Sequence, residues 1–119
     1  MIALTPQMRV FLLVDSVDFR KGIDGLVQVS REKVKEDPFS GALFLFRNRQ
    51  HTAIKGVIYD GQGFWLLMKR LSQGRFRYWP EQTSVGEEVA RLLSRELSVL
   101  LWNGDPSKAL MGSDWKKLE

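Results

Sequence analysis

The chain has 119 residues, of which 44% are hydrophobic and 27% charged, values typical of a soluble globular protein. We therefore expect one domain over residues 1–119, able to bury a core without disulfide or metal support. The lack of cysteine excludes disulfides, thiol catalysis and thiolate metal sites, and a single histidine, His51, excludes multi-histidine ligation. No apolar run approaches the ~20 residues that a membrane span needs. With no signal-peptide pattern at the amino terminus, the chain is expected to be cytoplasmic.

The first expected elements are a strand and a helix. The apolar run over residues 8–14 predicts a buried strand, bounded by Pro6 and Asp15. Over residues 18–34, apolar residues recur at helical spacing. Asp15 or Ser16 could cap this helix. Pro38 and Gly41 then predict a loop over residues 35–41.

Four more strands are expected, over residues 42–47, 52–59, 63–69 and 75–79. Glycines at residues 60–63 and 72–74 mark turns, so consecutive strands should form an antiparallel meander. On the last of these strands, alternation places Phe76 and Tyr78 on one face, and Arg75, Arg77 and Trp79 on the other.

After Pro80 the composition becomes acidic and helical. Thr83 or Ser84 could cap a helix whose apolar side includes Val85, Val89, Leu92 and Leu93. Residues 103–106, Asn-Gly-Asp-Pro, should end the helical segment. The predicted fold class is therefore α+β, with an amino-terminal strand and helix, a β-meander and a helical carboxyl end.

Positive charge is concentrated in the middle of the chain. Residues 41–80 contain seven basic residues and one acid, whereas the first forty residues balance six against six and the last thirty-nine have five bases and seven acids. With a pI of about 9.6, this excess favours an anionic partner such as nucleic acid. Alternatively, the aromatic residues are core and the arginines are only the solvated face of a sheet. The residues predicted to contact phosphate are Arg47, Arg49, Lys55, Lys69, Arg70, Arg75 and Arg77, extended by Arg20 and Lys21, with Trp65 and Trp79 as candidates for base stacking.

A catalytic site is a weaker interpretation of the same sequence. The available carboxylates are Asp15, Asp18, Asp24 and Asp60, but two-metal phosphoryl transfer needs two or three that converge. Asp15 fits a helix cap and Asp60 a hairpin turn. No phosphate-binding glycine loop and no nucleophile motif is present. We expect no catalytic residues, no metal and no cofactor.

Several short motifs, taken together and in order, resemble one protein family. They are Val17-Asp18-Phe19-Arg20-Lys21-Gly22-Ile23-Asp24-Gly25-Leu26, Leu43-Phe44-Leu45-Phe46-Arg47-Asn48-Arg49, Tyr59-Asp60-Gly61-Gln62-Gly63-Phe64 and Gly74-Arg75-Phe76-Arg77-Tyr78-Trp79-Pro80. This series, roughly over residues 9–80, is similar to the TnpB accessory proteins encoded by the second open reading frame of insertion-sequence-sixty-six elements.

The resemblance implies a non-catalytic role in DNA transposition beside a separate acidic-triad transposase. The partners to expect are DNA, at transposon ends or target, and the transposase. No membrane partner is expected, and a homo-oligomer is compatible with these features. An alternative is a protein-interaction subunit that docks on the transposase without contacting DNA. A third is a nuclease, which a magnesium or manganese cleavage assay would reveal.

Overall fold

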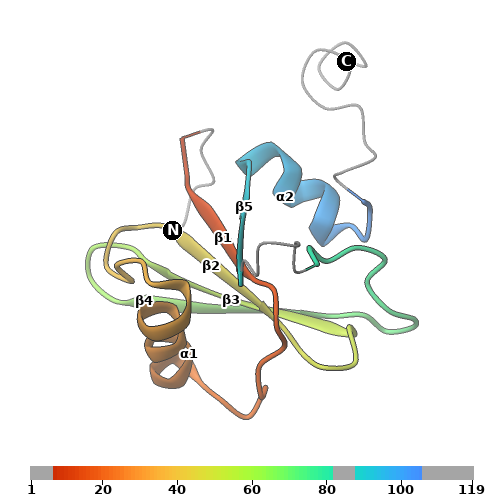
Figure 1. Cartoon of the computed structure of the whole chain (residues 1–119), viewed down its shortest axis with the longest axis horizontal. Coiled ribbons are helices and arrows are strands. Elements are labelled where there is room, and N and C mark those ends of the chain that lie inside the picture. Colours follow the sequence, from red (N-terminus) through yellow and green to blue (C-terminus); the bar gives the residue numbers. More distant parts are fainter. Residues whose placement is uncertain (1–6, 82–87, 106–119) are drawn as a thin grey trace.

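The computed structural model describes residues 7–81 and 88–105 and contains a five-stranded mixed sheet with a helix on each face (Figure 1). The strand order is β4-β3-β2-β1-β5. This architecture confirms the α+β class and the carboxyl-terminal helix. The elements are β1 (Val10–Leu13), α1 (Ile23–Val29), the π-helical turn η1 (Ser30–Val34), β2 (Leu43–Arg47), β3 (Ala53–Tyr59), β4 (Phe64–Arg70), β5 (Val89–Leu92) and α2 (Ser94–Leu101).

The sheet combines an antiparallel meander with one parallel pair. Strands β2, β3 and β4 are successively antiparallel, as predicted, while β1 lies parallel to β2 and antiparallel to β5. A parallel pair needs a crossover connection, and the segment that carries α1 supplies it. The β3–β4 hairpin is also confirmed, because the two strands pair along their whole length. In its turn, the Asp60 carboxylate accepts the N–H groups of Gln62 (2.8 Å) and Gly63 (2.9 Å).

Two apolar clusters lie on opposite faces of the sheet. Val10 and Leu12 of β1 point into a cluster with Leu97 and Leu100 of α2. The alternate residues of β1 point into a second cluster beneath α1, which contains Leu26. Because both faces of the sheet are covered, β1 is buried along its whole length. Its sequence therefore does not alternate between apolar and polar residues. None of the helices in the described ranges is long and apolar enough to span a membrane.

The first helix begins later than predicted. Helix α1 starts at Ile23 with Gly22 at its N-cap, and no side chain caps it, so neither Asp15 nor Ser16 has the capping role. Residues 18–21 form a turn instead, in which the Lys21 N–H donates to the Asp18 carbonyl oxygen at 3.1 Å. The Asp18 carboxylate binds Arg20 within this turn. The helix therefore starts only after the turn, at Ile23.

The predicted strand at residues 75–79 is wrong. The segment has no strand partner and crosses the α2 face of the sheet, where Phe76 and Trp79 are both buried in the core. The Trp79 indole N–H donates to the Leu13 carbonyl oxygen at 2.9 Å. These two aromatic residues are three apart, so strand alternation assigned Trp79 to the wrong side.

The start of the carboxyl-terminal helix was also predicted wrongly. Val89 and Leu92 belong to β5, because this stretch pairs with β1. Helix α2 follows from Ser94, and the Glu96 carboxylate accepts the Leu93 N–H at 2.8 Å. The predicted cap at Thr83 or Ser84, together with Val85, lies outside the described residues. The helix ends before Asn103, which has a left-handed φ of 64°, as the turn composition predicted.

Candidate nucleic-acid interface

One end of the sheet gathers most of the exposed basic residues of the middle segment. The end of β2, the turn into β3 and the end of β4 meet there, because these strands are antiparallel neighbours. The segment after β4 is tied to the same turn, since the N–H of Phe76 donates to the His51 carbonyl oxygen at 2.7 Å. We call this region the basic end; its members are Arg47, Arg49, His51, Arg70, Arg75 and Arg77.

The β2–β3 turn is organised by Asn48. Its side-chain oxygen accepts the N–H groups of Thr52 (2.9 Å) and Ala53 (3.1 Å), and its Nδ2 donates to the Thr52 hydroxyl at 2.7 Å. These bonds hold His51 in a left-handed conformation with φ of 61°. Arg49 is therefore presented at the tip of an ordered turn, exposed to solvent.

A second asparagine positions the segment that bears Arg75 and Arg77. The Arg77 N–H donates to Asn103 Oδ1 at 2.6 Å, and Asn103 Nδ2 donates to the Arg75 carbonyl oxygen at 3.2 Å. Both bonds use backbone groups of the arginines. The end of α2 thus fixes this segment while the guanidinium groups stay available. Sequence reasoning gave Asn103 only a helix-ending role and missed this function.

Four arginines of the basic end are exposed and have no ion-pair partner in the described part of the chain. The ion pairs between described residues join Arg9 to Glu36 and Arg20 to Asp18. Four guanidinium groups without an ion pair on one end of a sheet can donate charge-assisted hydrogen bonds to phosphate oxygens. They are Arg49, Arg70, Arg75 and Arg77.

Arg47 differs from these four, because it is half-buried and bonded to the backbone. Its Nε donates to the Val14 carbonyl oxygen and a terminal nitrogen donates to that of Asn48, both at 3.2 Å. Burial lowers its pKa, and the nearby Asp15 carboxylate opposes that shift. Its main contact role is therefore structural, although its charge still adds to the field of the basic end.

The pKa of His51 responds to the positive charges around it. Burial lowers the pKa of its imidazole, and the charges of Arg47 and Arg75 lower it further. It lines a cleft together with Arg77 and two acids, Asp15 and Glu81. The same positive field that disfavours protonation of His51 would attract an anion to this end of the sheet.

Two lysines predicted to contact phosphate are occupied by the fold. Lys55 is only 8% exposed, and its ammonium donates to the carbonyl oxygens of Phe19 (2.7 Å) and Lys21 (3.0 Å). Lys69 donates to the Leu101 carbonyl oxygen and lies over the Trp102 ring. Neither ammonium faces solvent freely, so both differ from the sequence-based expectation.

The other residues predicted to contact DNA do not lie at the basic end or are not free to bind there. Arg20 is exposed but bound to Asp18, with a shortest distance of 2.7 Å, and Lys21 lies beside it before α1. Trp79 is buried, which is inconsistent with base stacking. Trp65 is exposed, but it lies at the hairpin end of β4, where its indole N–H donates to Asp60 Oδ2 at 2.7 Å.

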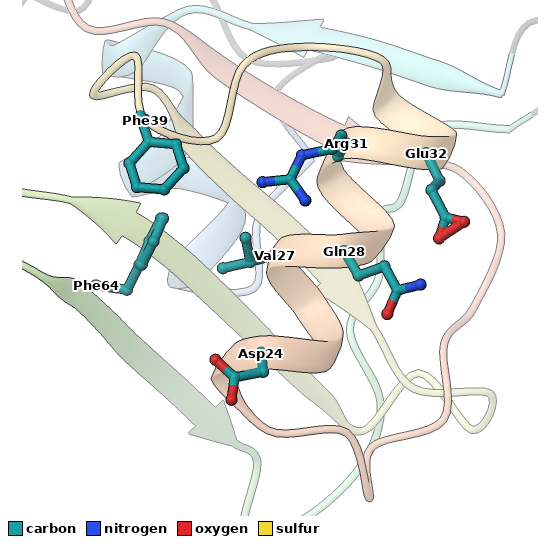
Figure 2. A pocket seen from close by; sticks show the side chains of 7 residues that line it. All are labelled: Asp24, Val27, Gln28, Arg31, Glu32, Phe39 and Phe64. Atoms are coloured by element: carbon teal, nitrogen blue, oxygen red, sulfur yellow. The ribbon is translucent and has the colours of Figure 1, made fainter.

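The described carboxylates do not gather into one cluster. In residues 7–81 and 88–105, no group of three acidic or histidine side chains could hold an ion. Figure 2 shows an open cavity beside α1 whose acids, Asp24 and Glu32, point in different directions from separate turns of the helical segment. The aromatic rings of Phe39 and Phe64 form its other side. This arrangement gives no convergence of the kind that two-metal chemistry needs.

Comparison with known proteins gives one family and two relatives. Residues 8–110 match the family described as IS66 Orf2 like protein. Over 119 residues, the chain is 28% identical to the uncharacterized protein y4jC of Sinorhizobium fredii (strain NBRC 101917 / NGR234), covering 100% of this chain and 91% of the relative. It is 35% identical over 109 residues to the uncharacterized protein y4hO of the same organism, covering 92% and 84%. No solved structure matches.

Proposed function

The chain belongs to the IS66 Orf2-like family of transposition-associated proteins, and from this membership we propose that it assists transposition by binding DNA through the basic end. It acts without catalysing the strand chemistry. The partner is DNA of the element ends or of the target, and the contacts are to phosphate oxygens.

The observation that carries this proposal is the set of four exposed arginines without an ion pair in the described residues. Surface cations are usually dispersed among acids, whereas here the acids of the middle segment number one against seven bases. Each phosphate neutralised by a cation releases condensed counterions, which makes the association constant fall with salt. The side-chain oxygens of Asn48 and Asn103 accept backbone N–H groups and so hold the segments that carry the arginines. Little ordering is therefore needed on binding.

The test is the salt dependence of DNA binding by Arg75→Gln/Arg77→Gln. Fluorescence anisotropy with duplex and with single-stranded DNA would give the association constant at several salt concentrations. We expect weaker binding and, for duplex DNA, a log–log slope smaller in magnitude by about 1.8, because each phosphate that is no longer neutralised reduces the slope by ~0.9.

The matched control is Arg31→Gln/Lys33→Gln, which removes the same charge from exposed positions beside α1. Its slope should stay close to that of the wild type. Failure of the wild-type protein to retain either form of DNA at low salt would contradict the proposal. An equal reduction of the slope in the control variant would contradict the assignment to the basic end.

A second candidate function is docking on the transposase without DNA contact. The observation in its favour is Trp102, which is 83% exposed at the end of α2, because tryptophan is enriched in the energetic centres of protein interfaces. Trp102→Ala should then abolish co-purification with the transposase of the same element. This interaction should hardly respond to salt and should survive the Arg75→Gln/Arg77→Gln change.

A further inference from the structure

Strand β4 is an edge of the sheet and exposes large apolar side chains. The sheet order places β3 on one side of it, and no described element pairs with its other side. Free edges are normally short, charged or covered, because unpaired backbone groups promote association with another strand. Seven residues long, β4 instead exposes Trp65 (43%), Leu66 (36%), Leu67 (42%) and Met68 (54%).

The backbone groups that face outward from β4 follow from the β3–β4 ladder. At its two ends, the Asp60 N–H donates to the Gly63 carbonyl oxygen at 3.0 Å and the Leu71 N–H donates to that of Thr52 at 2.9 Å. Antiparallel ladders alternate between bonded and non-bonded pairs, so Trp65, Leu67 and Lys69 direct their backbone groups toward β3. The backbone N–H and C=O groups that point away from the sheet belong to Phe64, Leu66, Met68 and Arg70.

We propose that a second copy of this chain occupies the β4 edge, through antiparallel pairing of the two β4 strands about a two-fold axis at Leu67. The two sheets would then join into one. Closed two-fold assemblies of this kind use the same surface on both copies.

The register follows from backbone geometry and overlap. Residues directly opposite each other must both face outward or both face inward along the ladder, which excludes every register shifted by one residue. Of those that remain, pairing Leu67 with its own copy is the one that pairs all seven residues of β4. Leu66 then lies opposite Met68 of the second copy.

The same register makes the charges complementary. Lys69 lies opposite Trp65 and Arg70 opposite Phe64, so no cation faces another cation, and cations are attracted to aromatic faces. Phe64 and Arg70 are on the α1 side of the sheet, since their β3 partners are Tyr59 and Ala53. A two-fold axis perpendicular to the sheet keeps the two faces equivalent.

Arg70 of the second copy would therefore reach the cavity in Figure 2. That cavity is lined by Phe64 and Phe39, by the acids Asp24 and Glu32, and by Arg31. The aromatic rings and the two acids favour a guanidinium group there, and the charge of Arg31 in the same cavity opposes it. Arg70 would then serve the interface, and DNA contact would fall to Arg49, Arg75 and Arg77.

The first experiment measures the mass of the full chain in solution by light scattering and sedimentation. Twice the 13.7 kDa of one chain is expected. Leu67→Lys and Leu67→Glu should each give monomers, because like charges would meet at the axis. Mixing the two variants should restore a dimer, because opposite charges then meet. Leu67 is exposed, so both variants should remain folded, as circular dichroism would verify.

The second experiment tests the register by disulfide formation. The wild-type chain has no cysteine, so Leu67→Cys should yield a cross-linked dimer under mild oxidation, since opposite Cβ atoms lie within bonding range. Met68→Cys is the control and should not cross-link efficiently. Cross-linking at both positions to the same extent would overturn the proposed register.

Hydrogen exchange distinguishes pairing of two β4 strands from coverage of the β4 edge by another part of the same chain. In the dimer, the amides of Leu66 and Met68 should be protected and should lose that protection in Leu67→Lys. The Leu67 amide, which faces β3, should stay protected in both. A wild-type monomer at high concentration would overturn the proposal, as would a monomer with a protected edge, which would mean that another part of the same chain covers it. None of these readouts depends on DNA, so the proposed function is tested separately.

Discussion

The ammonium group of Lys55 lies 2.7 Å from the Phe19 carbonyl oxygen and 5.0 Å from the centroid of the Phe19 ring. It donates a second bond, of 3.0 Å, to the Lys21 carbonyl oxygen. A single buried lysine in β3 therefore stabilises, through two hydrogen bonds, the turn that leads into α1. Its charge is compensated by backbone dipoles and an aromatic face, with no described carboxylate in an ion pair with it.

Lys55→Met should destabilise the fold without changing the salt dependence of DNA binding. The methionine keeps most of the apolar stem but leaves two carbonyl oxygens without their donor, and such changes cost about 1–3 kcal/mol. Denaturant unfolding would measure the change in the free energy of unfolding. Arg49→Gln, at an exposed position, is the control and should stay within about 0.5 kcal/mol of the wild type. A Lys55→Met protein as stable as this control would be inconsistent with the structural role.

Trp79→Phe and Trp65→Phe should separate a core tryptophan from a surface one. Trp79 is buried, and its indole N–H bonds the Leu13 carbonyl oxygen of β1. Removal of that donor should cost about 1–3 kcal/mol. Trp65 makes its bond to Asp60 in an exposed position, so removal of its indole N–H should cost less than about 1 kcal/mol. Thermal unfolding of both variants would check the order, and equal destabilisation would contradict it.

Sequence patterns correctly predicted the strands whose pairing partners are close in sequence. The glycine-containing turn at residues 60–63, between two stretches rich in strand-forming residues, was enough to place β3 and β4. By contrast, β5 was missed because its strand conformation depends on pairing with β1, almost eighty residues earlier. The stretch around Val89 and Leu92 has helical spacing, and only the non-local partner makes it a strand.

The candidate site was predicted in part for the same reason. Charge counting found the arginines of the basic end, since net charge needs no knowledge of the fold. It could not distinguish Lys55 from Arg75, because the carbonyl groups that hold Lys55 belong to a turn 34–36 residues away. The alternation of aromatic residues and arginines over residues 75–79 imitates a strand, although Phe76 and Trp79 both face the core.

The Asp18 carboxyl should titrate with a pKa of about 2, against an ordinary 3.8. The side-chain hydrogen bond from Arg20 is the main cause, followed by the bond from the Arg20 backbone N–H. Because the folded pKa is depressed, the contribution to stability is present above pH 3.8 and is lost as the pH falls toward 2. Carbon NMR of the carboxyl group would measure the value. In Arg20→Gln the pKa should rise toward 3.8, whereas Lys21→Gln, which removes a minor charge effect, should leave most of the depression.

The imidazole of His51 should titrate below its ordinary pKa of 6.5, because burial and then the charges of Arg47 and Arg75 disfavour its protonation. Its contribution to stability is therefore present above pH 6.5 and is lost as the pH falls through the folded pKa. As the chain has one histidine, proton NMR follows it without ambiguity. Arg75→Gln should raise the pKa, and Arg49→Gln should change it less.

Duplex DNA provides the decisive comparison for His51. Phosphates bound at Arg75 would offset the positive field, so the pKa of His51 should rise on saturation with DNA. By linkage, DNA binding should then tighten as the pH falls through the interval between the two pKa values. The rise should be smaller in Arg75→Gln/Arg77→Gln, because that variant lacks two of the guanidinium groups that we propose bind phosphate there. A pKa that is unchanged by saturating DNA would place the DNA away from this end of the sheet.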